Sequence, residues 1–194
     1  METLHYVIAE CDQAYLNERE LSNGVTIVTN TTIESVEHLN RIGTVKAAPR
    51  GTILQKGDQI IMHHNIVRKR ANTQGDRVES DYLVDPKEYF VPLDLIFAYK
   101  RGDGDWEALA PYFFVKPIEN EEKITESGII LPALEKYVHR EAKLWFLNEE
   151  LREWGLEKGD IVGYDKNQEY KFEIDGELLY RVRMPKLLYQ RCKD

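Results

Sequence analysis

The sequence predicts an all-β chain in which two small barrels or sandwiches follow one another, with little helix. Three observations lead to this prediction. Short runs of β-branched and aromatic residues recur along the chain and are separated by Gly and Pro, as expected of strands joined by turns. Stretches with helical periodicity are few and short. Most of the elements recur in the same order in the second half, which favours a duplicated domain.

The first half contains six predicted strands, which follow a segment that is hard to interpret. Within residues 1–23, Tyr6–Ala9 is compatible with a short strand, and we treat the whole segment as an N-terminal extension. The first strand of the domain is then the β-branched run Val25–Thr29. The strands that follow it are Gly43–Ala48, Gln59–His63, Tyr82–Val84, Tyr89–Val91 and Leu93–Tyr99.

The second half repeats this plan after a charged, Gly-containing linker at Lys100–Asp105. Tyr112–Pro117 takes the place of Val25–Val28. Leu156–Val162 matches Leu54–Ile60, and both segments contain Lys-Gly-Asp before an apolar strand. We therefore predict an N-terminal extension at residues 1–23, a first domain at residues 24–101 and a second domain at residues 106–194.

The connection after the first strand differs between the two halves. In the second half it spans Pro117–Glu141 and contains the apolar triplet Ile129–Leu131 between Gly128 and Pro132. In the first half it spans Thr29–Ile42, is shorter and spaces its apolar residues singly. The triplet has two interpretations, an ordinary core strand of the barrel or an apolar docking segment on a loop. The polar run before the triplet and the lack of a counterpart in the first half favour the docking segment.

These features together resemble the GroES-type co-chaperonin family. The resemblance is best from Tyr112 to Arg191, where a strand ending in Val-Lys precedes Ser-Gly-Ile-Ile-Leu-Pro and then Lys-Gly-Asp-Ile-Val. Residues 24–100 resemble a diverged second copy. The resemblance implies two tandem GroES-like irregular β-barrels and a chaperone that caps an ATP-driven chaperonin ring. By position, the chaperonin-binding residues would be Gly128, Ile129, Ile130 and Leu131.

The resemblance also implies the partners and two departures from the family. The partners would be GroEL-type apical domains, an unfolded client protein inside the cage, and further copies of the chain in a homo-oligomeric ring. No cofactor is implied, because the ATP binds to the chaperonin. The chain departs in having one docking loop for two domains, and in Asn148–Gly155, which looks like an acidic helical turn where the family has a roof hairpin. The alternative function is a non-enzymatic structural or assembly module in which Ile129–Leu131 is buried.

Composition and motifs argue against other classes of function. The net charge is −8 and the only basic cluster is Arg68–Arg70, which argues against nucleic-acid binding. His63 and His64 would point to opposite faces of a strand and could not easily share a metal ion. Cys11 and Cys192 lack metal-type spacing, and no catalytic motif or membrane-length apolar stretch is present. We expect a cytoplasmic protein without enzymatic activity, metal, nucleic-acid partner or membrane association.

Overall fold

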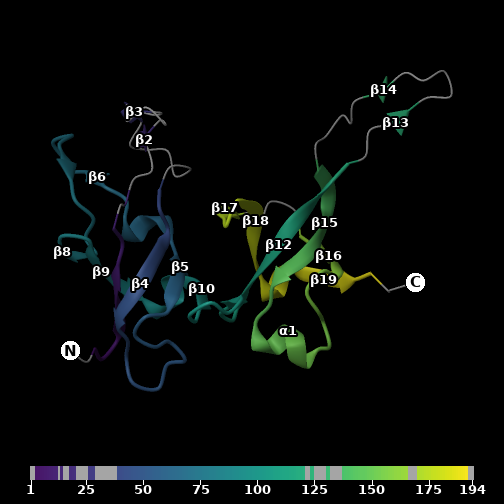
Figure 1. Ribbon diagram of the computed structural model, residues 1–194, viewed down its shortest axis with the longest axis horizontal. Coiled ribbons are helices and arrows are strands. Elements are labelled where there is room, and N and C mark those ends of the chain that lie inside the picture. Colours follow the sequence, from purple (N-terminus) through teal and green to yellow (C-terminus); the bar gives the residue numbers. More distant parts are fainter. Residues whose placement is uncertain are drawn as a thin grey trace. The chain divides into compact units, whose positions relative to one another are not determined.

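The computed structural model describes residues 3–12, 14, 18–20, 26–28, 39–120, 123–124, 130–131, 137–165 and 170–191. Over these residues the chain is all-β, as predicted, with two large antiparallel sheets (Figure 1). The only α-helix in this part of the chain is α1, Glu149–Glu153. The chain divides into two compact units, Met1–Trp106 and Glu107–Asp194.

The first unit is built on a seven-stranded sheet with the order β11-β10-β5-β4-β1-β9-β8. Strand β1 lies inside this sheet, where Val7 pairs with Val91 of β9 and Ala9 pairs with Val45 of β4. These four side chains are buried, so β1 contributes to the core of the unit. The strands are β1 (Tyr6–Glu10), β4 (Ile42–Ala47), β5 (Gln59–Met62), β8 (Leu83–Asp85), β9 (Glu88–Pro92), β10 (Ile96–Lys100) and β11 (Trp106–Ala108).

The segment between β5 and β8 adds a small hairpin to the first unit. It comprises η2 (His64–Ile66), β6 (Arg70–Ala71) and β7 (Arg77–Val78), and β6 pairs with β7 in a two-stranded sheet. A second 3-10 turn, η3 (Leu93–Leu95), separates β9 from β10. The basic cluster Arg68–Arg70 leads into this hairpin, where Lys69 and Arg70 form ion pairs with Glu79 and Asp81.

The predicted start of the first domain is wrong. Residues 1–23 are not an extension, because β1 is an inner strand of the first sheet. The Val25–Thr29 run is not the first strand of that sheet either. Its described part, Thr26–Val28, is β3, which pairs with β2 (Glu18–Glu20) in a separate two-stranded sheet. β-Branched residues favour an extended backbone but do not determine which neighbour a strand pairs with.

The second unit is built on a six-stranded sheet with the order β17-β18-β12-β15-β16-β19. Read in reverse, from β19 to β17, this order corresponds strand by strand to β10-β5-β4-β1-β9-β8 of the first sheet. Each unit therefore arranges its successive strands in the same way. The duplication inferred from sequence is therefore present in the strand order. The strands are β12 (Tyr112–Glu119), β15 (Tyr137–Phe146), β16 (Ile161–Tyr164), β17 (Tyr170–Ile174), β18 (Glu177–Arg183) and β19 (Leu187–Gln190), with the turn η4 (Met184–Lys186) before β19.

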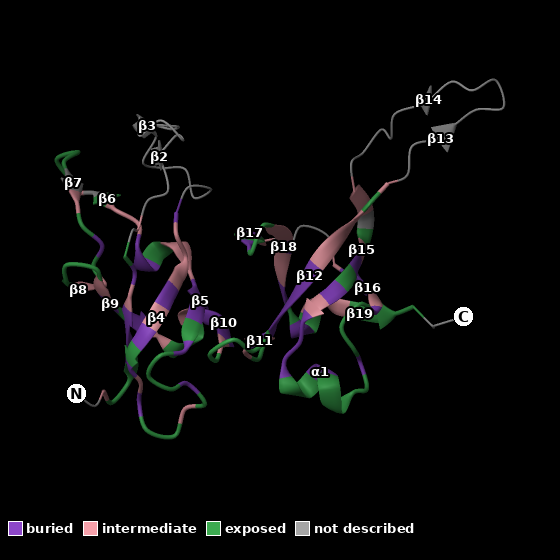
Figure 2. Ribbon diagram, in the orientation of Figure 1, coloured by how far each residue is buried: buried purple, intermediate pink, exposed green. Residues whose placement is uncertain are grey.

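The two faces of the second sheet each carry buried aromatic residues. Phe113 on β12 packs in a core with Leu144 of β15 and Val182 of β18. Phe114 points to the opposite face, where its ring lies 5.3 Å from that of Phe146 and 5.5 Å from that of Phe172. Figure 2 shows the buried residues along β12 and β15 in purple. Burial on both faces explains why β12 is a nearly continuous apolar run instead of an alternating one.

Helix α1 confirms the helical turn expected between β15 and the second Lys-Gly-Asp sequence. Asn148 is buried and caps the helix, since its Oδ1 accepts a hydrogen bond of 2.9 Å from the Leu151 amide. Its Nδ2 donates to the carbonyl of Tyr112 at 2.8 Å, which fixes the helix to the start of β12. Leu151 is buried in the core. None of the described helices is long and apolar enough to cross a membrane.

Candidate functional site

The connection between β12 and β15 carries the predicted docking residues. Within it, β13 (Lys123–Ile124) pairs with β14 (Ile130–Leu131), and Ile124 lies opposite Ile130. This hairpin is a two-stranded sheet separate from the six-stranded sheet of the unit. Ile130 and Leu131 therefore belong to a strand that is not part of the large sheet. Gly128 and Ile129 lie outside the described residues.

The strands that support this connection change their pairing just before it. β12 and β15 pair from Phe114 and Phe146 to Glu119 and Tyr137, but the register shifts between Pro117 and Glu119. Proline has no amide hydrogen and cannot continue the ladder. On the opposite strand Arg140 adopts a φ of 61°, which is unusual for a residue with a side chain. The irregularity has the character of a β-bulge and separates the loop from the regular ladder below it.

A cluster of polar side chains fixes β15 close to this connection. Arg191 donates two hydrogen bonds to the Glu141 carboxylate, at 2.9 and 2.7 Å, and the Tyr189 hydroxyl donates a third at 3.0 Å. The hydrogen bond to Glu141 and then burial raise the pKa of Tyr189. Glu141 lies on β15 and Tyr189 on β19, so the contacts span the intervening strand β16. Gly163 of β16 makes room for them, because a side chain there would meet the Tyr189 ring.

The first unit has the same kind of connection, which the sequence analysis missed. It runs from β1 to β4, through residues 11–41, and contains the β2–β3 hairpin. The prediction that the first half has the shorter connection is therefore wrong, since the equivalent segment in the second unit is residues 120–136. The error came from assigning Val25–Thr29 to the barrel. The apolar run at Tyr6–Ala9 was the sequence feature that could have prevented it.

The two Lys-Gly-Asp turns have the same hydrogen bonds. In the first, the Gly57 amide donates to the Val45 carbonyl at 2.8 Å, and the Asp58 carboxylate accepts from the Gln55 amide at 2.8 Å. In the second, the Gly159 amide donates to Leu144 at 2.8 Å, and Asp160 accepts from Glu157 at 2.9 Å. Both glycines have positive φ, 93° and 96°, a conformation that favours glycine. The sequence match therefore reflects one turn built twice.

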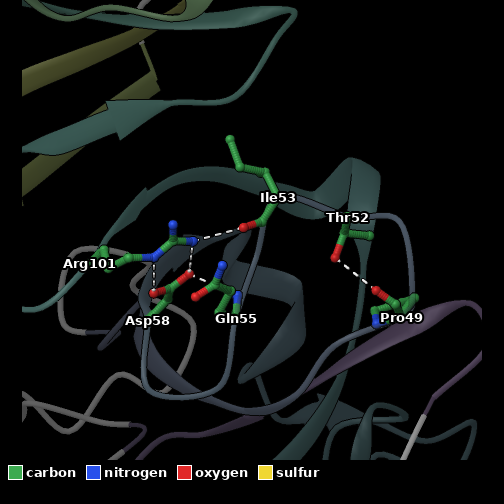
Figure 3. A network of polar contacts seen from close by, with 6 residues as sticks. All are labelled: Pro49, Thr52, Ile53, Gln55, Asp58 and Arg101. Atoms are coloured by element: carbon green, nitrogen blue, oxygen red, sulfur yellow. Dashed lines mark hydrogen bonds and ion pairs between the residues drawn. The ribbon is translucent and has the colours of Figure 1, made fainter.

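The aspartates of these turns have different partners. Figure 3 shows Arg101, the residue that follows β10, donating hydrogen bonds to both carboxylate oxygens of Asp58, at 3.0 and 2.9 Å, and to the Ile53 carbonyl at 2.8 Å. Burial alone would raise the pKa of Asp58. The hydrogen bonds from Arg101 and Gln55 and the Arg101 charge outweigh burial, so the pKa lies below its ordinary value of 3.8. In the second unit the neutral Gln190 amide donates to Asp160 at 2.8 Å.

The His63–His64 pair is arranged differently from the prediction. Strand β5 ends at Met62, and His63 caps the turn η2, so the two residues are not on a strand. Their rings stack with centroids 4.2 Å apart. Burial, followed by the neighbouring charges of His63, Arg41 and Arg68, lowers the pKa of His64 to about 4. Within the described part of the chain, no group of three or more His, Cys, Asp or Glu residues is placed to hold a metal ion.

Comparison with known proteins gives neither a matching family model nor a significant match to a curated protein sequence. The features of the chain that bear on its function are the duplicated strand order, the paired Lys-Gly-Asp turns and the two hairpins. Each hairpin lies in the connection between two inner strands.

Proposed function

We propose that this protein is a non-enzymatic co-chaperonin of the GroES type, which caps an ATP-driven chaperonin ring and assists protein folding. Its docking segment is Gly128-Ile129-Ile130-Leu131. The observation that carries the proposal is that Ile130 and Leu131 lie on a hairpin outside the six-stranded sheet, in the connection between inner strands. A segment needed for the core would be expected to pair within that sheet. Ile130 and Leu131 instead pair in a separate two-stranded sheet, which favours a docking role over a role in the core.

The energetics suit a cap that binds and leaves in each cycle. Complete burial of three large aliphatic side chains contributes about 5–9 kcal/mol. Ordering a loop on binding costs roughly 2–5 kcal/mol. One loop would then bind weakly, with a dissociation constant from the millimolar to the micromolar range. Several loops acting together on one ring strengthen binding by orders of magnitude without making any single contact slow to release.

The proposal defines the partners and the place of work. The loops bind apolar grooves on GroEL-type apical domains, the cage below holds an unfolded client, and several copies of the chain form the cap. ATP is bound and hydrolysed by the chaperonin and not by this chain. The cytoplasm is the compartment in which such a chaperonin meets newly made clients.

The proposal is tested by ATP-dependent co-sedimentation with a purified GroEL-type chaperonin. We expect the wild-type protein to sediment with the ring when nucleotide is present, and Ile130→Asp to reduce the bound fraction at least tenfold, because a carboxylate cannot enter an apolar groove without a large desolvation cost. Ile53→Asp is the matched control, since Ile53 is 54% exposed on a turn of the first unit.

Two outcomes would contradict the proposal. If the wild-type protein fails to bind, the co-chaperonin function is wrong and a structural or assembly module becomes the better interpretation. If Ile130→Asp and wild type bind equally, the assignment of the docking segment is wrong.

A further inference from the structure

We propose that the second unit carries a docking surface for an acidic segment of another protein. We call it the lysine surface, and it consists of Lys116, Lys143 and Lys158 together with the Trp145 ring. This inference goes beyond the proposed function, because it uses neither the β12–β15 connection nor a chaperonin.

The lysine surface lies on the face of the second sheet that also holds Phe114. Lys116 of β12 and Lys143 of β15 are direct cross-strand partners, and such partners point to the same face. The ammonium groups of Lys116 and Lys158 lie 4.9 and 4.8 Å from the centre of the Trp145 ring, within the range of a cation–π interaction. Lys143 and Lys158 are exposed and Trp145 is half-buried, so a partner can reach all of these side chains.

The positive charge of this surface is only partly balanced within the unit. Glu177 forms an ion pair of 2.6 Å with Lys116. Neither Lys143 nor Lys158 forms an ion pair with any residue that the structure describes. Like charges directly opposite each other destabilise a sheet, and an incoming carboxylate would relieve the repulsion between Lys116 and Lys143.

The first unit shows that the fold does not require this arrangement. Both sheets shift register at the same place, after Ile8 on β1 and after Phe114 on β12. Two residues further along each strand, Glu10 in the first unit takes the place of Lys116 in the second. Glu10 forms an ion pair with Lys46 on the neighbouring strand β4. The first unit therefore balances its charges at this position, whereas the second unit accumulates cations.

The size and sign of the lysine surface favour an acidic protein segment over a nucleic acid. A nucleic-acid binder presents an extended basic face that follows the phosphate backbone, whereas three lysines match a few neighbouring carboxylates. The net charge of the chain is −8, which opposes the approach of a long polyanion. The Trp145 ring adds apolar contact area beside the charges. Complementary charge of this kind contributes more to orientation and specificity than to affinity, so we expect weak binding.

Fluorescence anisotropy of a dye-labelled hexaglutamate peptide, titrated with the full chain at low salt, tests the proposal. We expect a dissociation constant below about 1 mM that increases with added NaCl, because salt screens exposed charges. The double variant Lys143→Gln/Lys158→Gln should bind about 5- to 30-fold more weakly, the upper part of the range for loss of two exposed ion pairs. Lys56→Gln is the matched control, because Lys56 occupies the same position in the first Lys-Gly-Asp turn. It should bind like the wild type.

Three results would overturn the proposal. They are no binding of hexaglutamate, equal binding by the wild type and the double variant, or tighter binding of a six-nucleotide single-stranded DNA through the same lysines. Lys143→Arg/Lys158→Arg keeps the charge and should bind like the wild type, which separates loss of charge from loss of structure. These results do not bear on the co-chaperonin proposal, which depends on residues 128–131.

Discussion

Asp58 shows how a single residue can keep one structural role while its environment changes. Its carboxylate closes the Lys-Gly-Asp turn just as Asp160 does in the second unit. Arg101 adds a bidentate ion pair to Asp58, whereas Asp160 accepts a hydrogen bond from the uncharged Gln190 amide. The Asp58 side chain is 3% exposed. A hydrogen bond from a charged donor is stronger than one from a neutral amide, so we expect the first turn to depend on Arg101 more than the second depends on Gln190.

Arg101→Gln tests this dependence and has a defined pH signature. We expect the free energy of unfolding at pH 7 to fall by about 1.5–3 kcal/mol, the range for hydrogen bonds to a charged group. Because the folded-state pKa of Asp58 lies below 3.8, the stabilisation is complete above that pH and is lost as the pH falls through the lowered pKa. The difference between wild type and variant should therefore shrink in acid.

Urea unfolding across a pH series measures this effect. Lys100→Gln removes the same charge from the neighbouring residue and is the matched control, which should change stability little. An Arg101→Gln penalty that stays constant from pH 7 to pH 2 would show that the ion pair is not its source.

At the scale of elements, the sequence predicted the kinds of structure well and the strand partners less well. Both Lys-Gly-Asp turns and the helical turn at α1 follow from local patterns, because Gly and a capping Asn specify local backbone geometry. The choice between Tyr6–Glu10 and Val25–Thr29 as an inner strand depends on distant partners, β4 and β9. Local propensity carries no information about such pairing, and Val25–Thr29 is the more β-branched of the two.

The same limit applied to the candidate site. Ile130 and Leu131 stood out because Gly128 and Pro132 bracket the triplet that contains them. Ile27 did not stand out, because it lies in a β-branched run that is typical of an ordinary strand. Only the order of strands in the two sheets shows that these residues occupy equivalent connections.

Shortening the β12–β15 connection tests the independence of the hairpin from the sheet. We expect replacement of residues 121–136 by a short Gly-Ser turn to abolish ATP-dependent chaperonin binding while changing the melting temperature by only a few degrees. The reason is that β13 and β14 pair only with each other among the described strands. Circular dichroism melting and co-sedimentation measure the two effects. Loss of the folding transition would show instead that the hairpin is part of the stable core.

At the scale of the whole molecule, the edges of the two sheets present apolar side chains. β8 ends the first sheet and β19 ends the second. Val84 on β8 is 46% exposed, and Leu188 and Tyr189 on β19 are 57% and 49% exposed. Exposed, apolar edge strands invite pairing with another chain. These edges are consistent with the proposed assembly of several copies.

Native mass spectrometry tests this assembly. We expect species at multiples of the chain mass of 22.7 kDa, and a ring of seven chains would match a seven-fold chaperonin. Leu188→Lys should shift the distribution towards the single chain, because a charged residue on an edge strand opposes pairing. Arg50→Lys keeps the charge of an exposed turn and is the control. A wild-type protein that remains a single chain at micromolar concentration would contradict the proposed ring.

The repeated strand order also creates a problem of self-recognition while the chain folds. β1 and β12 fit the same place in two sheets, so either could enter the wrong one, a known failure of duplicated domains. Side-chain volume distinguishes them. β1 presents Val7 and Ala9 to its core, whereas β12 presents Phe113 and Val115 to its own. A misplaced β12 would overfill the first core, at a cost of about 1–3 kcal/mol for each oversized residue. The difference in side-chain volume between the two copies therefore favours the pairing of each strand within its own sheet.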